Sequence, residues 1–456
     1  MSRWLTFTTV CLVMIPGRPS TGTAQAVTVP ADSAGIAGWY DLGAAGRALV
    51  TWGARGGYRL LDFDSLHFLS LKSVDQDHYR TGGSGGWADA EVRFDRRTGQ
   101  GAVAMSIRLP GGEELRGHRA REYPFEQEEV RYRSGSVTLG GLLMVPRVRK
   151  LVGRSSGTLH QVPIGLPAVV ILHGSGDSDR DNIWAFTFAQ SLARAGLVTL
   201  FADKRGCGAS GGDWRTVGLD GLVDDALAGI EALRSDPRVD STRVGLVGLS
   251  QGGMVAPLAA ARSAHVAFVV SVSSAAVTLF DQMRHEMIQD LHRAGIPPEA
   301  IRAIEHVGAL AVAYARTLSD DDWKRYQAAR ADLMSGPLAE AAAGFPESRE
   351  DWHWQWWKSV GDVDPLPAWE AYSGPSLAIF GEDDEQDNVP VRESVQRLQE
   401  AIRPELHPEH LIRVYRGKGH TLADEDRGWV GLDVLADLDA WVLHAVGGLD
   451  PARTPQ

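Results

Sequence analysis

A serine with a glycine two positions away on each side can be presented as an exposed nucleophile, because the glycines let the chain turn tightly around it. The pattern G-x-S-x-G occurs four times in the chain, at 82–86, 153–157, 208–212 and 248–252. The turn also requires a strand before the serine and a helix after it. Only the last match has an apolar run before it and a helical pattern after it. The spacing therefore predicts Ser250 as the nucleophile, flanked by Gly248 and Gly252.

Attack on an acyl carbonyl requires hydrogen-bond donors for the oxygen that becomes negatively charged. The backbone N–H of Gln251, directly after the nucleophile, is the first candidate donor. A second donor is expected in the loop after the first central strand, where the sequence reads His173-Gly174-Ser175-Gly176. Because the glycines permit close approach of the backbone, the N–H of Ser175 is the second candidate. We expect His173 to orient this loop and not to transfer protons.

A general base is expected on a loop that follows a late strand. His420 has that position, after Arg413-Val414-Tyr415 and two glycines. The acid that orients this histidine should follow the preceding strand, where the chain is rich in acidic residues. Asp384 is favoured, and Asp383 and Asp387 remain open. The order Ser, Asp, His along the chain is the order of the nucleophile-elbow hydrolases.

These residues need a parallel sheet whose strand ends meet at one edge, because ligands bind at the carboxyl ends of such strands. After residue 124 apolar runs alternate with helical patterns, which predicts a mostly parallel sheet covered on both faces. A hairpin is expected first, through 130–132 and 142–145. The expected strands are 168–172, 198–202, 244–247, 266–272, 377–380 and 411–415. The expected helices are 182–195, 219–234, 251–263, 391–402 and 428–445.

Two other parts of the chain have different patterns. Residues 36–122 contain short alternating apolar runs at 48–52, 58–61, 66–69, 91–94 and 102–107, which predict a small all-β sandwich or barrel. Residues 276–372 contain long helical patterns, no expected strand and six of the 14 tryptophans, which predicts a helical cap. Its aromatic side chains either line an apolar substrate pocket or form the cap's own core. The sequence leaves both interpretations open.

The N-terminus has the pattern of a signal peptide, with Arg3, an apolar stretch from residue 4 to 15, and Ala24-Gln25-Ala26. We expect cleavage after Ala26 and export of the protein. Cleavage removes Cys11 and leaves Cys207 as the only cysteine. The expected organisation is a signal peptide at 1–26, a β-rich domain at 27–124, a first core part at 125–275, a cap at 276–372 and a second core part at 373–456.

Composition excludes several classes of protein. The 456 residues have a formal net charge of −12, with 44% hydrophobic and 23% charged residues, which are values typical of globular proteins. An acidic chain has no general attraction to nucleic acid or to anionic lipid, so neither is an expected partner. No later segment approaches 18 uninterrupted apolar residues, so no membrane anchor is expected. The sequence gives no indication of oligomeric state.

The chain from about 125 to 445 resembles the α/β-hydrolase superfamily, and within it secreted bacterial esterase or peptidase-like members. The resemblance depends on His-Gly-Ser-Gly at 173–176, Asp-Arg-Asp at 179–181 and Asp-Lys-Arg-Gly at 203–206. Asp177 stands where a proline usually follows the first motif. The resemblance implies an α/β-hydrolase fold with a mostly parallel sheet, here with a helical cap insertion and a small all-β N-terminal domain.

These observations predict an exported serine hydrolase that acts on a small-molecule ester with a bulky apolar or aromatic group. A peptidase or amidase with the same triad is the first alternative, followed by a thioesterase or acyltransferase. From a different class of protein, an inactive binding scaffold remains an alternative. No cofactor and no metal are expected.

Three other motifs could indicate a different chemistry, but each is weaker evidence than the pattern around Ser250. Residues 206–211 match the dinucleotide pattern G-x-G-x-x-G, but no helix opens on the third glycine. His407 and His410 lack further ligands at metal-binding spacing. Cys207 lies in a glycine turn without a strand-to-helix elbow of its own, so a structural role is expected.

Overall fold

The computed structural model describes most of the chain. The described residues are 35–52, 57–62, 67–82, 87–97, 101–120, 125–147, 165–180, 182–339, 343–403, 405, 407–424 and 429–447. The predicted signal peptide, Cys11 and Asp181 lie outside them. So do the G-x-S-x-G match at 153–157 and residues 83–86 of the first match.

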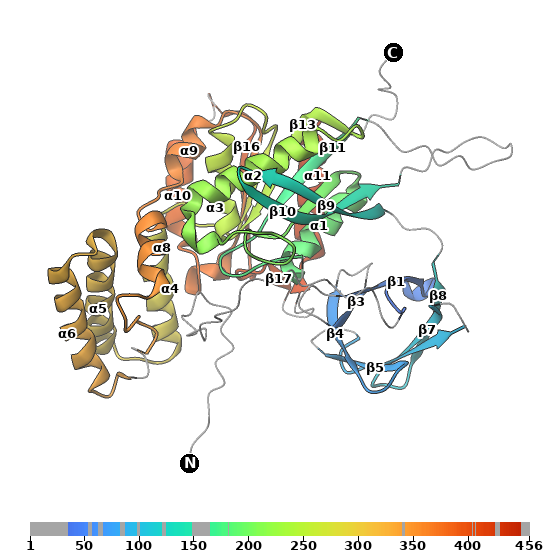
Figure 1. Cartoon of the computed structure of the whole chain (residues 1–456), viewed down its shortest axis with the longest axis horizontal. Coiled ribbons are helices and arrows are strands. Elements are labelled where there is room, and N and C mark those ends of the chain that lie inside the picture. The colour runs from blue at the N-terminus through green and yellow to red at the C-terminus, as the bar shows by residue number, and fades with distance from the viewer. Residues whose placement is uncertain are drawn as a thin grey trace.

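The N-terminal part is a closed barrel of eight antiparallel strands in sequence order (Figure 1). Its strands are β1 (Gly38–Asp41), β2 (Arg47–Trp52), β3 (Tyr58–Asp62), β4 (His67–Ser73), β5 (His78–Gly82), β6 (Glu91–Arg96), β7 (Ala102–Arg108) and β8 (Glu114–Arg119), with the short helix η1 (Gly43–Ala45) after β1. Alternate side chains such as Val92 and Phe94 are buried, as expected of a strand with one face on a core. Closure pairs β1 with β8, through Tyr40 and Arg119.

Three barrel strands were not expected from the sequence. β1, β5 and β8 are short or polar, and β8 has only one large apolar residue, Leu115, among its six residues. These three strands form because each completes the backbone hydrogen bonds of an adjacent strand, and not because of their own side-chain pattern. Gly117 in β8 lies so close to β1 that an added Cβ would be 2.7 Å from the carbonyl oxygen of Asp41.

The second part contains an eight-stranded sheet in the order β16-β15-β14-β13-β11-β12-β10-β9. Neighbouring strands from β11 to β16 pair in parallel, and the hairpin β9–β10 pairs antiparallel at one edge. The strands are β9 (Phe125–Ser134), β10 (Val137–Pro146), β11 (Leu166–Leu172), β12 (Val198–Ala202), β13 (Val239–Leu249), β14 (Val269–Val272), β15 (Ser376–Gly381) and β16 (His410–Tyr415).

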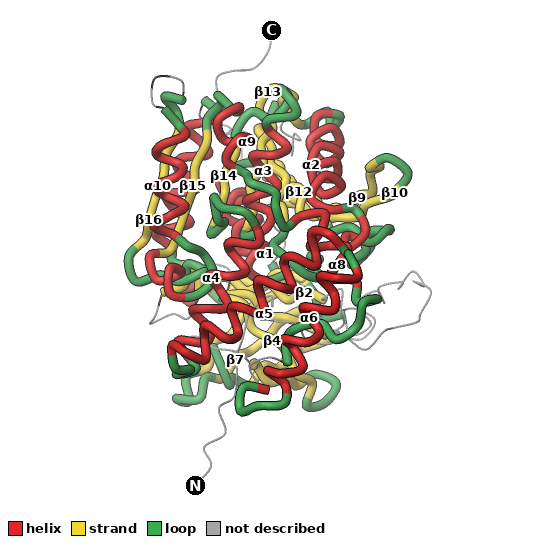
Figure 2. The backbone as a smooth tube through the Cα atoms, turned by 90° about the vertical axis from the view of Figure 1, so that its left-hand side faces the viewer, coloured by secondary structure: helices red, strands yellow, loops and turns green. Residues whose placement is uncertain are grey.

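Helices cover both faces of this sheet (Figure 2). α1 (Ile183–Ala195) and α11 (Leu432–Ala445) share one apolar core, and α2 (Gly218–Arg234), α3 (Gln251–Ala260) and α10 (Val391–Ala401) share the other. The strands between them are apolar on both faces, as in β15, where all six residues are buried. The predicted fold class is therefore confirmed.

The last helix begins later than predicted. It starts at Leu432 and not at residue 428, because Trp429–Val430 form a short strand, β18, that pairs with β17 (Ala423–Asp424). α3 also ends at Ala260, three residues before the predicted end.

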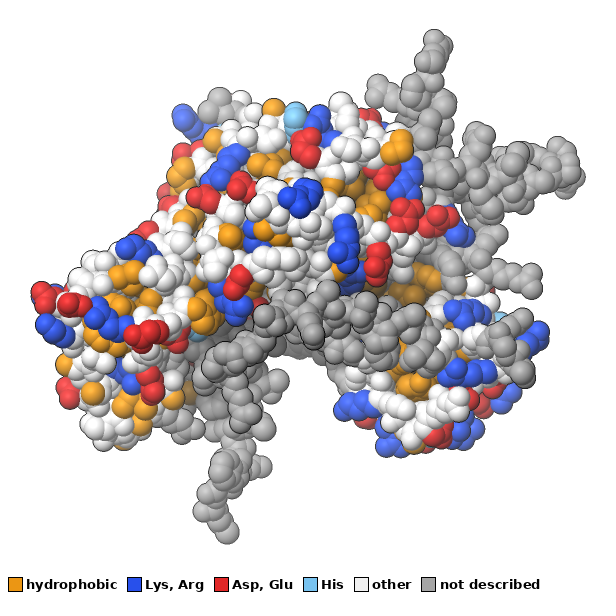
Figure 3. All heavy atoms as spheres, viewed as in Figure 1, with side chains coloured by type: hydrophobic (Ala, Val, Ile, Leu, Met, Phe, Trp, Pro, Cys, Tyr) orange, Lys and Arg blue, Asp and Glu red, His pale blue; other side chains and the backbone are white. Residues whose placement is uncertain are grey.

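An all-helical insertion stands between β14 and β15, and we call it the cap. Its helices are α4 (Leu279–Arg293), α5 (Pro298–Thr317), α6 (Asp320–Met334), α8 (Trp352–Val360) and α9 (Leu366–Ala371). In Figure 1, α4, α5 and α6 project from the sheet domain on the side away from the barrel. On the face shown in Figure 3, acidic and basic side chains are interspersed over the cap and the barrel.

Three of the six cap tryptophans, Trp323, Trp354 and Trp357, are packed inside it. Trp354 is 1% exposed, and its ring lies 4.8 Å from that of Tyr314 and 5.2 Å from that of Tyr326, with near-perpendicular planes. Such edge-to-face contacts suit aromatic quadrupoles. Trp352 is the exposed exception, at 40%. Trp323, Trp354 and Trp357 therefore belong to the cap's own core, which was one of the two interpretations of the sequence.

Among the described residues, no helix is long and apolar enough to cross a membrane.

We expect Trp354→Ala to destabilise the protein by about 3–5 kcal/mol, because it opens a cavity among packed rings. Trp352→Ala, on the same helix but exposed, should change stability by less than about 1 kcal/mol. Urea unfolding followed by circular dichroism measures both. Equal unfolding midpoints for the two variants would contradict the assignment of Trp354 to the cap core.

Candidate active site

Ser250 lies at the junction of β13 and α3 in a backbone conformation that L-residues rarely adopt, with φ 50° and ψ −119°. Such a conformation costs about 1–3 kcal/mol and must be stabilised by its surroundings. The Ser250 N–H donates to the carbonyl oxygen of Val272 at 2.8 Å, which ties the turn to β14. The turn therefore holds the Ser250 side chain at the carboxyl end of the central strand.

The two flanking glycines make this turn possible. A Cβ on Gly248 would lie 2.0 Å from the carbonyl oxygen of Gly252. A Cβ on Gly252 would lie 2.4 Å from the carbonyl oxygen of Leu172, at the end of β11. Neither position has room for a side chain, because backbone atoms fill both spaces.

The loop after β11 lies against Ser250. A Cβ on Gly174 would be 3.3 Å from the Ser250 Cβ and 3.8 Å from its Oγ. Gly176 has φ +74°, a conformation that favours glycine. The structure thus brings the segment with Ser175 beside Ser250, and Gln251 is the first residue of α3 on the other side. Backbone N–H groups in the first turn of a helix have no intrahelical acceptor.

Asp384, in the short helix η3 (Glu382–Gln386), and His420, 36 residues later, are brought together. The His420 ring nitrogen Nδ1 lies 2.8 Å from Oδ2 of Asp384, whose side chain is fully buried. Oδ1 of the same carboxylate accepts from the backbone N–H of Asn388 at 3.2 Å. Nδ1 donates its hydrogen to the carboxylate of Asp384. The other ring nitrogen, Nε2, is therefore the one that can take up and release a proton.

The other two candidate acids are positioned elsewhere. Asp387 forms an ion pair with Arg293 of the cap at 2.7 Å. Asp383 is exposed, and its backbone N–H donates to the carbonyl oxygen of Lys418. Of the three acids that the sequence left open, Asp384 is therefore the one that contacts His420.

Electrostatics favours the protonated form of His420. Burial alone lowers the pKa of the imidazole, but the charge and hydrogen bond of Asp384 outweigh it, and Asp387 and Glu286 act in the same direction. The net pKa is raised above the ordinary value of 6.5. A histidine stabilised in this way can accept a proton readily during a reaction.

Trp184 packs on the His420 loop. Its ring centroid lies 5.4 Å from that of His420, and its Nε1–H donates to the carbonyl oxygen of Thr421 at 3.1 Å. Trp184 is the second residue of α1, and Asn182, just before the helix, donates to Ser178 Oγ in the loop after β11 at 2.9 Å, so the start of α1 contacts both loops. The sequence analysis did not single out Trp184.

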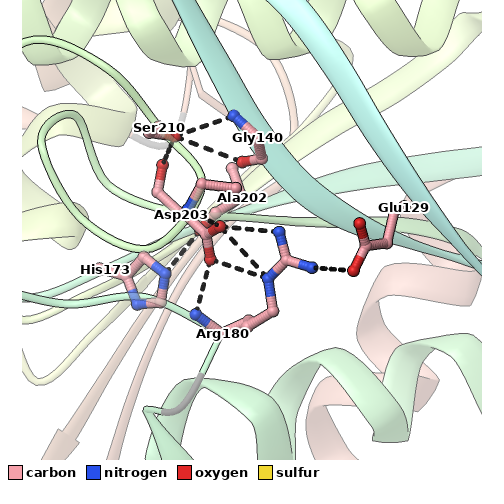
Figure 4. A network of polar contacts seen from close by, with 8 residues as sticks. Glu129, Gly140, His173, Arg180, Ala202, Asp203 and Ser210 are labelled. Carbon is pink, nitrogen blue, oxygen red and sulfur yellow. Dashed lines mark hydrogen bonds and ion pairs between the residues drawn. The ribbon is translucent and has the colours of Figure 1, made fainter. Parts of the chain in front are cut away.

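The ring of His173 contacts two neighbouring segments. Its Nε2 lies 2.7 Å from the carbonyl oxygen of Ala202, at the end of β12, and its Nδ1 lies 3.0 Å from Oγ of Ser178. Both ring nitrogens are therefore engaged within the loops after β11 and β12. Figure 4 shows the ring directed toward Ala202.

Asp203 joins the same loops (Figure 4). Its buried carboxylate accepts from the guanidinium of Arg180, with the shortest contact at 2.7 Å, and from the backbone N–H of Arg180 at 2.9 Å. It also accepts from the N–H of Ala209 at 2.9 Å, and Ser210 Oγ donates to its carbonyl oxygen. Arg180 and Asp203 therefore have a structural role, which accounts for their place in the sequence motifs.

Two buried charged residues near the site were missed by sequence reasoning. Glu286 of α4 is 6% exposed and acts electrostatically on His420. Lys204 follows β12 and is 8% exposed. The only sequence signal for Lys204 was its position in the motif at 203–206, and Glu286 had none, because cap packing alone brings it near His420.

Cys207 is buried, and burial raises the pKa of its thiol to about 11. A protonated thiol is a poor nucleophile, so the placement agrees with a structural role. In the part of the chain that the structure describes, no group of three His, Cys, Asp or Glu side chains is arranged to hold a metal ion.

A sequence model of the Alpha/beta hydrolase family matches residues 169–431 of this chain. Among solved structures, an esterase from Pyrococcus furiosus is similar, with 17% identity and a TM-score of 0.45 over 71% of this chain and 95% of the esterase. The alpha/beta hydrolase GrgF from a Penicillium species has 19% identity and a TM-score of 0.44, over 71% and 100% of the two chains. A proline iminopeptidase from Mycobacterium smegmatis has 18% identity and a TM-score of 0.44, over 71% and 100%. Among curated protein sequences no significant match is found.

We expect NMR titration of the His420 ring to give a pKa above 6.5, and Asp384→Asn to lower it, because burial remains while the stabilising charge is removed. Asp387→Asn is the matched control and should lower the pKa less, since Asp387 is paired with Arg293. An unchanged His420 pKa in Asp384→Asn would contradict the electrostatic role of Asp384.

Proposed function

The chain belongs to the alpha/beta hydrolase family, and we propose that it is a serine hydrolase that cleaves carboxylic esters through an acyl-enzyme on Ser250. The observation that carries this proposal is the backbone conformation of Ser250, at φ 50° between β13 and α3. Strained backbone conformations cluster at functional sites, where the surrounding structure holds them in place. At Ser250 the close backbone contacts at Gly248 and Gly252 hold the strained turn.

In the proposed reaction, Ser250 Oγ attacks the acyl carbon while His420 Nε2 takes the hydroxyl proton. The carbonyl oxygen becomes an oxyanion, which the backbone N–H groups of Gln251 and Ser175 stabilise. When the tetrahedral intermediate collapses, the C–O bond to the alcohol breaks and His420 gives its proton to the leaving oxygen. A water molecule, deprotonated by His420, then attacks the acyl-enzyme and releases the acid and free Ser250.

Asp384 has an electrostatic and orienting role in this scheme. Its bond to Nδ1 keeps Nε2 available for the proton, and its charge stabilises the imidazolium that forms in each half-reaction. The raised pKa of His420 reflects the same interaction. Removing the carboxylate would leave a buried imidazolium without the counter-charge that contacts it.

The aromatic residues beside the loop after β11 support an ester with a bulky apolar group. η2 (Trp214–Thr216) contributes Trp214, whose ring lies 5.0 Å from that of Trp356 and 5.4 Å from that of Trp352. The Nε1–H of Trp214 donates to Asp177 in that loop at 2.8 Å. We propose that this cluster, and not the packed interior of the cap, contacts the substrate.

A peptidase remains the second candidate because one observation favours it. Glu286 brings a buried carboxylate from the cap into the electrostatic environment of His420. Gln282, one turn earlier in α4, donates to Asn388 at 3.3 Å, so this face of α4 lies over the loop that holds Asp384. A carboxylate in that position could bind the ammonium group of a peptide N-terminus or of an amino-acid ester.

We expect the protein to hydrolyse nitrophenyl esters and Ser250→Ala to lose about 10⁴-fold or more of kcat. Rates on esters from acetate to benzoate measure the size of the acyl site. Amide analogues tested alongside decide between the two candidates, since turnover of amides alone would favour the peptidase. Equal ester hydrolysis by the wild type and Ser250→Ala would exclude Ser250 as the nucleophile.

The role of Glu286 has its own test. If it binds an ammonium group, Glu286→Gln should reduce kcat/KM for an amino-acid nitrophenyl ester about 10-fold or more, because a charge-assisted hydrogen bond is lost. The N-acetylated form of the same ester is the control and should be affected much less. An equal effect on both substrates would assign Glu286 to the environment of His420 and not to substrate binding.

A further inference from the structure

Lys204 is a buried lysine whose ammonium group has three acceptors in the candidate active site. Its Nζ donates to the carbonyl oxygen of Gly174 at 2.9 Å, to that of Gly176 at 3.1 Å and to Oε1 of Gln251 at 2.9 Å. An ammonium group has three N–H donors, so its hydrogen-bonding capacity is filled. None of these acceptors is a carboxylate, which is unusual for a lysine that is 8% exposed.

The contact with Gly174 determines the direction of the Ser175 N–H. The carbonyl of Gly174 and the N–H of Ser175 belong to one peptide group, which is planar and trans, so the two bonds point in opposite directions. By holding the oxygen on its own side, Lys204 directs the N–H away from itself. A cation on the carbonyl oxygen also polarises the amide and makes its N–H a stronger donor.

The contact with Gln251 has a parallel effect on the other candidate donor. Gln251 is the first residue of α3, and its backbone N–H is available because the first turn of a helix has no intrahelical acceptor. Holding its side chain at Lys204 keeps that side chain from folding back over the N–H. One ammonium group thus connects the two segments that supply both donors.

We propose that Lys204 is the positioning residue of the oxyanion site, which fixes the Gly174–Ser175 peptide and the Gln251 side chain so that both N–H groups face the same point beside Ser250. The proposal rests on the proposed function, because it gives the two donors a reacting oxygen to stabilise. Lys204 itself does not contact that oxygen.

The charge of Lys204 is sensitive to pH. Burial lowers the pKa of its ammonium group to about 8, although the neighbouring groups Cys207 and Asp177 act in the opposite direction. Two cations lie over the ring of Trp214. Lys204 Nζ is 4.6 Å from the ring centroid, and the guanidinium of Arg215 is 6.0 Å from it. A neutral amine has two donors for three acceptors, so deprotonation releases one of these bonds.

The proposal predicts a bell-shaped dependence of kcat/KM on pH. Activity should rise as His420 loses its proton, with a pKa above 6.5, and should fall again as Lys204 loses its proton near pH 8. Cys207 titrates higher, near 11, so it does not account for a fall near pH 8.

The experiment compares wild type, Lys204→Met and Cys207→Ala on nitrophenyl acetate between pH 5 and 10. A nitrophenyl phosphonate, which labels a reactive serine, counts the active sites, and a trifluoromethyl ketone, which forms a tetrahedral adduct with an oxyanion, probes the donors. We expect Lys204→Met to lower kcat per active site by about 10²-fold, the effect of losing one oxyanion donor, with little change in KM. Inhibition by the ketone should weaken in parallel. The fall of kcat/KM near pH 8 should disappear.

Cys207→Ala is the matched control, because it removes the neighbouring titratable group and leaves the ammonium contacts intact. It should keep the fall near pH 8 and the affinity for the ketone. An unchanged kcat and ketone affinity in Lys204→Met would overturn the proposal. If Lys204→Met does not fold, Gln251→Ala takes its place, because it removes one of the three acceptors of the ammonium group, and an unchanged kcat and ketone affinity in that variant overturn the proposal. A wild type that the phosphonate does not label at Ser250 would instead refute the proposed function.

Discussion

The close packing of backbone around Ser250 is the constraint on which the rest of the site depends. Gly248 and Gly252 face backbone atoms within 2.4 Å of where a Cβ would stand, so the turn can form only without side chains there. This contact joins the ends of β13 and β11 and the start of α3. Because those three segments meet at one point, Ser250, Gln251 and the loop with Ser175 lie together at one edge of the sheet.

Three buried charges around this point have specific partners. Asp384 has His420, Asp203 has Arg180 and two backbone N–H groups, and Lys204 has three oxygen acceptors. A buried charge without such partners would cost several kcal/mol. The matched groups hold loops from different strands in a fixed geometry, which is what electrostatic stabilisation of a transition state requires.

The other two parts of the chain meet this core through aromatic packing. The rings of Trp39 in the barrel and Phe125 at the start of β9 lie 5.5 Å apart, edge to face. On the cap side, Trp356 and Trp352 of α8 contact Trp214 of η2. The cap also contacts the segment that carries Asp384 and Asp387, through the ion pair of Arg293 with Asp387. The environment of His420 is therefore linked to the position of the cap.

Local pattern was enough to predict the strand-to-helix context of Ser250, the strands around it and the helical nature of the cap, because apolar periodicity follows from which face of an element is buried. It favoured Asp384 among three neighbouring acids but left the other two open, since the choice depends on which carboxylate a loop 36 residues away approaches. Nor could it show that Trp354 packs inside the cap while Trp352 is exposed. The strands β1, β5 and β8 and the role of Lys204 depend on partners distant in sequence. Only the tertiary structure brings those partners together, so only the tertiary structure decided these features.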